Sequence, residues 1–307
     1  MPGHSARKPL AARHREARSI AHAPTADLAA GLRWAALIAI VLTTIWSYWP
    51  TLVDLMKEWQ RDEDYSVGQL VPLAALWLLW HDRARLKTCV IRPCWWGMLV
   101  ILLAQGARAF GLVQLFQSAE RYSFVLTVAG VVLLVAGWQV FRRVAWILLF
   151  LFLMVPLPGR VHNMISGPLQ DLATVGAVVT LELFGTAVAR EGHVMVLNDN
   201  VPVAVAEACS GLRMLTAFIV VAATLAYVVN RPRWQKAVVL LSSIPVAIVC
   251  NLIRLVVTAW LFLVVSGEVA ERFFHDFAGW TMMPLAVVLL VAELWIMSRL
   301  VVEDAKR

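Results

Sequence analysis

The chain has 307 residues, of which 61% are hydrophobic and 15% are charged, and it contains 14 tryptophans. This apolar content exceeds what a soluble domain needs for its core, which excludes an ordinary soluble protein. The net charge of +7 could suggest a nucleic-acid partner, but the basic residues gather in alternate joints between apolar segments, which indicates membrane orientation and no nucleic acid.

The first 27 residues are rich in Ala, Arg and His and contain no apolar core. We expect residues 1–27 to form a disordered cytoplasmic tail rather than a cleavable signal peptide. No internal repeat or low-complexity linker follows. Residues 28–303 are therefore predicted to form one transmembrane domain.

Eight apolar segments follow, each near the ~20 residues that a helix needs to cross ~30 Å of hydrocarbon. They lie near residues 34–49, 67–80, 95–116, 122–141, 144–158, 212–229, 237–265 and 279–300. Because lipid-exposed open sheets would leave backbone groups unpaired, these segments must be helical. The expected fold is all-α, a polytopic transmembrane helix bundle of about eight spans.

The distribution of basic residues predicts the orientation of this bundle. Arg and Lys occur in the N-terminal tail, in the joints near 83–92, 142–143 and 231–236, and after the last span. By the positive-inside rule, both termini should lie in the cytoplasm. An acidic joint at 54–64 and a long joint at 159–208 then lie outside, so we expect the functional surface to be external.

The long external joint is not a simple loop. Apolar residues recur at near-helical spacing from Ile165 to Phe184, which predicts an amphipathic helix at the membrane interface, with a ninth span as the alternative. Residues 193–197 and 201–206 flank the turn Asn198-Asp199-Asn200 and predict a short hairpin. Its edge could hold an extended peptide, or the hairpin could be a plain connector.

The four cysteines differ in their surroundings. Cys89 and Cys94 lie in a cytoplasmic joint without the further ligands of a zinc site, and Cys250 lies inside a span as a small packing residue. Cys209 instead begins a helix at the outer interface. Unpaired backbone amides and the helix dipole lower the pKa of a thiol there and favour the thiolate, although a small packing residue is the alternative.

Two more polar residues are expected at the same depth. Arg254 lies inside the seventh span, where a charge costs at least ~2.5 kcal/mol without a polar partner, and it shares a helix face with Asn251 and Thr258. It could be catalytic, or a structural residue paired with Glu207 or Asp276. His275 directly precedes the eighth span.

Together, Cys209, Arg254 and His275 supply a nucleophile, an oxyanion stabiliser and a proton carrier, which are the groups that acyl transfer requires. This scheme calls for no metal and no cofactor. Glu207 and Arg213 flank the cysteine. Arg213 could lower the thiol pKa or bind a substrate carboxylate, or it could pair with Glu207 to fix the loop.

These residues carry a resemblance to a known family. The stretch Glu207-Ala208-Cys209-Ser210-Gly211-Leu212-Arg213, the Asn251-x-x-Arg254 motif and the downstream His275 resemble the pattern of the exosortase/archaeosortase family of polytopic cysteine transpeptidases. The likeness covers roughly residues 64–280. One departure is Val67, which stands where a histidine is expected in a Tyr-Ser-His-Gly stretch, and it bears on the subfamily rather than the chemistry.

The resemblance implies a function. Such an enzyme would lie in the cytoplasmic (inner) membrane among its lipids, with its active site on the external or periplasmic side. It would cleave the C-terminal sorting signal of secreted proteins, a short motif followed by a transmembrane helix and a basic tail as in PEP-CTERM proteins. A thioester at Cys209 would pass to an amine or hydroxyl acceptor, or to water.

Two other classes of protein remain open from the residues alone. A transporter would also place Arg254 and Asn251 near a polar pathway, and a lipid-linked glycosyl- or phosphotransferase would use external Arg and His residues on polyprenyl phosphate. Neither class explains a required thiol.

Overall fold

The computed structural model describes residues 35, 37–198, 201–204, 211–265 and 278–300. The expected disordered tail, residues 1–27, lies outside these ranges. The chain divides into two compact units, residues 1–50 and 51–307, and each is described by itself. In the first unit, Leu37–Ser47 is helical, within the first predicted span.

The helix α2 (Trp49–Arg61) occupies much of the acidic segment that was predicted to be a joint. Leu55 is buried, whereas Asp54 and Lys57 are exposed and form an ion pair at 3.9 Å. The charged residues therefore lie on the outer face of an amphipathic helix. In this segment, charged residues alternate with apolar residues at helical spacing, a pattern that a surface helix and a polar joint can both show.

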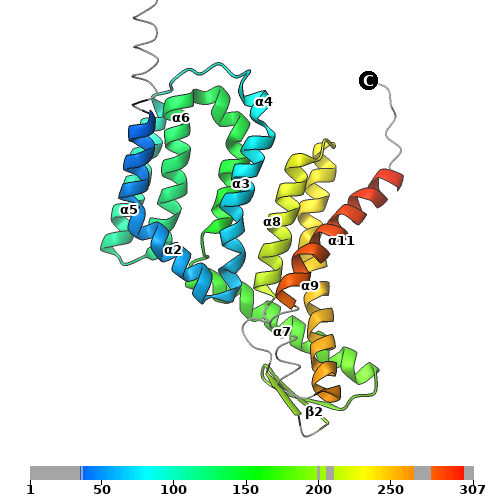
Figure 1. Ribbon diagram of the computed structural model, residues 1–307. Coiled ribbons are helices and arrows are strands. Elements are labelled where there is room, and N and C mark those ends of the chain that lie inside the picture. Colours follow the sequence, from blue (N-terminus) through cyan, green and yellow to red (C-terminus); the bar gives the residue numbers. More distant parts are fainter. Residues whose placement is uncertain (1–34, 36, 199–200, 205–210, 266–277, 301–307) are drawn as a thin grey trace, which may run out of the picture. The chain divides into compact units, whose positions relative to one another are not determined.

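The second unit is mostly helical, as the composition predicts (Figure 1). Its remaining elements are η1 (Glu63–Gln69), α3 (Leu70–His81), α4 (Arg83–Leu86), α5 (Trp96–Val113), α6 (Gln117–Phe150), η2 (Leu151–Met154), α7 (Gly159–Leu183), β1 (Val188–Glu191), β2 (Val194–Leu197), β3 (Val201–Ala204), α8 (Leu212–Val228), α9 (Arg233–Val264) and α11 (Ala278–Leu300). The bounds of α5, α8, α9 and α11 agree with the predicted spans to within a few residues, because these helices follow long and mainly apolar runs.

Helix α6 folds back on itself. The rings of Tyr122 and Phe152 stack with their centroids 6.0 Å apart, although thirty residues of straight helix would separate them by about 45 Å. The reversal occurs near Gly137, whose φ of 84° and ψ of −179° are not helical. A residue with a Cβ would meet the carbonyl oxygen of Arg92 there. Two predicted apolar segments thus become the two arms of one helical hairpin, as Figure 1 shows.

Among the described residues, four helices are long and apolar enough to cross a membrane, or five if Leu37–Ser47 and Trp49–Arg61 are taken as one bent span. These four are α5, α6 with η2, α7 and α9. By length and composition, α6 with η2 counts as one span, although it forms two arms that fold back on each other. The protein is a polytopic membrane protein, and the expected number of eight spans stays a prediction.

The two largest buried apolar clusters among the described residues form the larger and the smaller core of the second unit. The larger core, which includes Leu55, Val71, Leu78, Val125 and Ala217, joins α2, η1, α3, both arms of α6 and α8. The smaller core joins α7, β2 and the last third of α9, and contains Ala173, Ala177, Leu181, Met195, Leu197, Leu255 and Ala259. Helix α9 packs against both α7 and α8.

The predicted hairpin is confirmed in β2 and β3, which pair antiparallel with Leu197 opposite Val201. The structure adds β1, which pairs antiparallel with β2 and completes a sheet of order β1-β2-β3 in the described part of the chain. Strand β1 was not predicted, because Ala189-Arg190-Glu191 lacks the β-branched residues that typify strands. In the buried strand β2, Met195 and Leu197 are fully covered.

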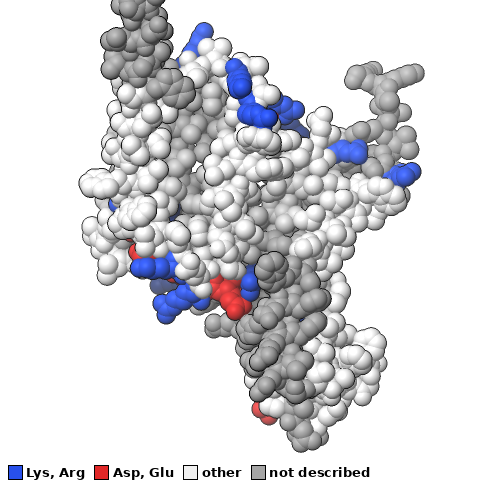
Figure 2. Space-filling view, in the orientation of Figure 1, with Lys and Arg blue, Asp and Glu red and all other residues white. Residues whose placement is uncertain are grey.

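Charge is distributed unevenly over the second unit. On the face in Figure 2, the Asp and Glu side chains lie toward the end that contains α2 and α7, and the opposite end, at α4, shows only Lys and Arg. A buried Asp82 accepts ion pairs from Arg85 and Arg143 at that basic end. Lys and Arg occur at both ends of this face, so its asymmetry lies in the acidic residues, whereas the positive-inside rule concerns Lys and Arg.

Candidate functional site

The polar face of α9 is formed by residues at three- and four-residue spacing. Arg254 donates a hydrogen bond from Nη2 to Oδ1 of Asn251 at 2.9 Å, and Oγ1 of Thr258 donates to the carbonyl oxygen of Arg254 at 2.8 Å. Asn251 and Thr258 are buried, whereas Arg254 is half-buried. The charge therefore lies at the edge of the packed interior, on the face that the sequence predicts.

The depth of Arg254 follows from the length of its helix. Helix α9 begins at Arg233, so Arg254 lies about 31 Å along its axis at ~1.5 Å per residue. This distance is close to the ~30 Å thickness of the hydrocarbon core. If α9 enters the membrane at its first turn, the guanidinium reaches the opposite interface, where a charge costs less than at the centre.

Gly211 brings the start of α8 against this polar face. It precedes α8 with a φ of 81°, in the left-handed region, and it is buried. A Cβ at this position would lie 2.9 Å from Nδ2 of Asn251. Only glycine satisfies both the backbone conformation and the contact, and residue 211 therefore touches the side chain that accepts a hydrogen bond from Arg254.

Arg213 pairs with an acidic residue that the sequence analysis did not connect to it. Its Nη1 donates to Oε2 of Glu63 in η1 at 2.8 Å. The sequence analysis considered Glu207 as its partner, or a direct role at the thiol. Because Glu63 is 150 residues away in the chain, no local spacing could have indicated this ion pair.

Three of the predicted site residues, Glu207, Cys209 and His275, lie outside the described residues. Of the remaining predicted residues, Asn251 and Arg254 are in direct contact with each other. Arg213 is the second residue of the helix that directly follows Gly211, and its side chain is turned to η1. The described part of the site thus consists of one polar face of α9, the start of α8, and η1 beside it.

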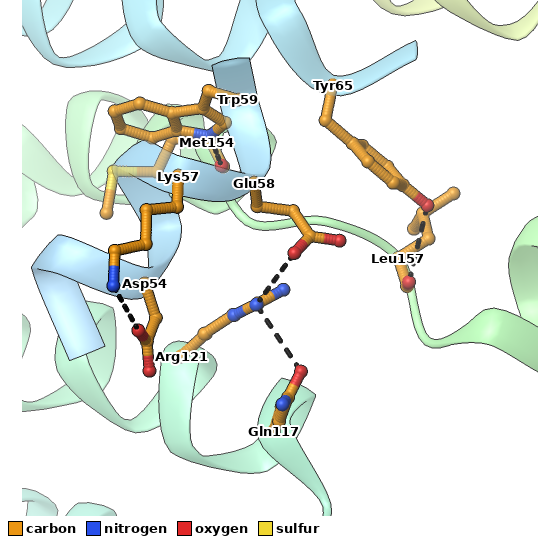
Figure 3. Close-up of polar contacts among 9 residues, drawn as sticks. All are labelled: Asp54, Lys57, Glu58, Trp59, Tyr65, Gln117, Arg121, Met154 and Leu157. Atoms are coloured by element: carbon orange, nitrogen blue, oxygen red, sulfur yellow. Dashed lines mark hydrogen bonds and ion pairs between the residues drawn. The ribbon is translucent and has the colours of Figure 1, made fainter. Parts of the chain in front are cut away.

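A second polar cluster, which the sequence analysis missed, connects η1 to the first turn of α7. The Tyr65 hydroxyl lies 2.7 Å from Nδ1 of His162, and Nε2 of His162 lies 3.8 Å from Oδ2 of the buried Asp64. The Tyr65 hydroxyl also donates to the carbonyl oxygen of Leu157 at 3.4 Å (Figure 3). Burial, with the nearby Asp62 and Asp64 carboxylates, raises the pKa of Tyr65, so its hydroxyl stays protonated at neutral pH.

Other side chains fasten the segment that leads into η1, as Figure 3 shows. The indole nitrogen of Trp59 donates to the carbonyl oxygen of Met154 at 3.0 Å. Arg121, which is nearly buried, contacts Glu58 at 3.4 Å and Gln117 at 3.5 Å. The tripeptide Asp62-Glu63-Asp64 was the available signal for the contacts of η1 with Arg213 and His162, since three consecutive acids before an apolar run require cationic or hydrogen-bonding partners when they are packed.

The sheet lies between α7, which packs against β1, and α9, which packs against β3. Strand β3 ends at Ala204, five residues before Cys209. On the other side of the sheet, Arg190 of β1 donates to Asp171 of α7 at 2.9 Å. Within the described ranges, no group of three or more His, Cys, Asp or Glu residues could hold a metal ion.

One family model matches the chain. It is described as transmembrane exosortase, and it matches residues 59–292, a range that runs from the end of α2 into α11 and contains every predicted site residue. No curated protein and no solved structure matches the chain.

Proposed function

Because the chain belongs to the transmembrane exosortase family, we propose that it is a membrane-embedded cysteine transpeptidase or protease. Its substrates are secreted proteins with a C-terminal sorting signal, formed by a short motif, a transmembrane helix and a basic tail. The single observation that carries the proposal is the match over residues 59–292, which includes Cys209, Arg254 and His275 in order. The enzyme acts at the external face of the cytoplasmic membrane.

The contact between Gly211 and Asn251 supports a shared site for the cysteine and the arginine. Gly211 follows Cys209 by two residues, and two residues of extended chain span at most about 7 Å. Asn251 accepts a hydrogen bond from Arg254. The thiol and the guanidinium therefore need no large rearrangement to approach one substrate carbonyl group.

The reaction proceeds by acyl transfer. With its proton held by His275, the Cys209 thiolate attacks the carbonyl carbon of the scissile peptide bond, and the oxygen becomes an oxyanion that Arg254 stabilises. The tetrahedral intermediate collapses, the C–N bond breaks, and His275 gives the proton to the leaving amine. This step leaves the substrate as a thioester on Cys209.

The second half of the reaction releases the product. An amine or hydroxyl acceptor attacks the thioester carbonyl, His275 takes the proton of the acceptor, and the C–S bond breaks to regenerate the thiolate. If water is the acceptor, the same steps constitute hydrolysis. Arg213 and Glu207 support the cysteine segment rather than react.

The orientation of the protein follows from its charges. The basic end of the second unit, at α4, faces the cytoplasm, and the end that carries η1, α7 and the sheet faces outward. A substrate anchored by its own transmembrane helix and cytoplasmic basic tail would then present its motif at the depth of Arg254. Membrane lipids surround the exposed apolar helices.

Processing of a tagged sorting-signal substrate in cells tests the proposal. Cys209→Ala should leave the substrate with its anchor, whereas Cys89→Ala, which changes a partly exposed cysteine between α4 and α5, should process it normally. Unchanged processing in the Cys209→Ala variant, at equal protein level, would remove the mechanism. Transport or lipid-linked transfer that survives this substitution would favour the other classes.

A further inference from the structure

The segment η1 holds the start of α8 in place through one ion pair. Arg213 is the second residue of α8, and a cation at a helix N-terminus is disfavoured by the helix dipole. Its guanidinium nevertheless lies 2.8 Å from the Glu63 carboxylate, which offsets that cost. Both side chains are about one-third to one-half exposed, so the pair contributes at most about 1 kcal/mol to stability.

The segment η1 is itself fixed on several sides. Asp62 caps it by accepting a hydrogen bond from the backbone N–H of Asp64 at 2.9 Å. Tyr65 contacts His162 at 2.7 Å, and Val67 belongs to the larger core together with Ala217 of α8. A carboxylate mounted on such a segment has little freedom, so it can define the position of the residue that it pairs with.

From this geometry we propose that Glu63 is a positioning residue for the nucleophile. Acting through Arg213, it fixes the start of α8 and with it the chain that leads back to Cys209, four residues earlier. Arg213 then only connects Glu63 to α8, and it does not act on the thiol or on the substrate. The contact of Tyr65 with His162 fixes the segment η1, which carries Glu63. This positioning role rests on the proposed function, because the turnover that it affects is the cleavage of a sorting signal.

A double-mutant cycle separates this role from a direct one. If Glu63 and Arg213 act only through each other, Glu63→Gln and Arg213→Gln should each lower kcat about tenfold with little change in KM, because misplacement of a catalytic group costs rate. The double variant should be no worse than either single variant. The charge-reversed pair, Glu63→Arg with Arg213→Glu, should recover most of the activity, since Glu is favoured at a helix N-terminus.

The controls are drawn from the same region. Asp54→Asn removes the carboxylate of another exposed ion pair, on α2, and should leave kcat unchanged. Tyr65→Phe removes only the hydroxyl that contacts His162 and should produce a smaller defect of the same kind. Thermal unfolding in detergent should differ little among all these variants, which excludes misfolding as the cause.

A second readout does not depend on turnover. In a form with Cys89→Ser and Cys94→Ser, the rate at which a membrane-impermeant maleimide modifies Cys209 reports the surroundings of the thiol. Glu63→Gln and Arg213→Gln should change this rate by the same factor, and Asp54→Asn should not change it. If the Cys209→Ala variant kept full activity, the proposed function would fail while the labelling rates still decided the positioning role.

Two results would overturn the inference. Additive losses, with Arg213→Gln far more damaging than Glu63→Gln, would show that Arg213 acts directly on the thiol or the substrate. Equal labelling rates and equal kcat in wild type and both single variants would show that the ion pair has no role at the site.

Discussion

The larger and the smaller core of the second unit differ in the residues that are exposed around them. Around the larger core, exposed residues are large and apolar, such as Leu73 and Leu102, at 64% and 62% exposure. Around the smaller core, exposed positions include Arg190 and Glu191 of an open sheet. Because an open sheet cannot lie exposed in hydrocarbon, we expect the sheet to lie in water, although α7 and α9 of the smaller core also expose large apolar residues such as Leu183 and Trp260.

The polar residues of the site lie on α9 between the smaller core and the start of α8. Helix α9 contributes Leu255 and Ala259 to the smaller core, and it presents Asn251 toward the start of α8, a helix of the larger core. Arg254 lies between them along the helix.

Labelling of introduced cysteines tests whether the two cores have different surroundings. Glu191→Cys, in the sheet, should react completely with a membrane-impermeant maleimide added from outside, whereas Leu102→Cys, on α5, should not react, because lipid covers it. Both variants are made with Cys89→Ser and Cys94→Ser, and that parent measures the background. Labelling at residue 102 that equals labelling at residue 191 would contradict the assignment of the two surroundings.

Substitution of Arg254 should have the largest effect on turnover. Arg254→Lys retains the charge but loses the planar fork of donors, and we expect kcat to fall about 10²- to 10³-fold, as for the loss of one oxyanion donor. Processing of the tagged substrate in isolated membranes measures this loss. Thr258→Val, which removes only a bond to the Arg254 carbonyl oxygen, is the matched control, and equal rates for Arg254→Lys and wild type would exclude an oxyanion role.

Truncation in the smaller core should cost stability. Leu181 is 1% exposed in α7, so Leu181→Ala should lower the free energy of unfolding by about 2–5 kcal/mol. Leu183, two residues later, is 82% exposed, and Leu183→Ala should change it by less than about 0.5 kcal/mol. Thermal unfolding in detergent compares the two, and similar losses would show that α7 does not pack as described.

The contact between the start of α8 and α9 should be weakened by one added methyl group at Gly211. Gly211→Ala places a Cβ at a positive φ and against Asn251, which should destabilise the protein by about 1–3 kcal/mol. Gly106 in α5 has open space around its Cβ position, so Gly106→Ala should be neutral or slightly stabilising. An unfolding midpoint unchanged by Gly211→Ala would argue against this junction.

Much of the membrane architecture could be predicted from the sequence, because long apolar runs determine helices directly. The bounds of α8 and α9 and the pairing of β2 with β3 agree with prediction. The extension of α2 into an acidic segment was not predicted, since alternating charge and apolar residues also suit a surface joint. The reversal of α6 was placed at Arg142 and Arg143, whereas the turn lies at Gly137, where only a glycine fits against Arg92.

The candidate site was predictable only in part. The spacing of Asn251 and Arg254 indicates their contact, because residues three apart on a helix are neighbours. The partner of Arg213 and the contact of Tyr65 with His162 join segments about 100 or more residues apart, so they depend on tertiary packing that no local pattern encodes. The roles of Cys209 and His275 stay predictions.

The most direct test of the account is to find the covalent intermediate. The purified enzyme is mixed with a sorting-signal substrate, quenched in acid within the first turnover, digested and analysed by mass spectrometry. The account predicts the N-terminal substrate fragment on the peptide that contains Cys209, as a thioester that hydroxylamine removes and that Cys209→Ala lacks. Turnover at a normal rate with the substrate attached to another residue, or to none while Cys209→Ala stays active, would contradict it.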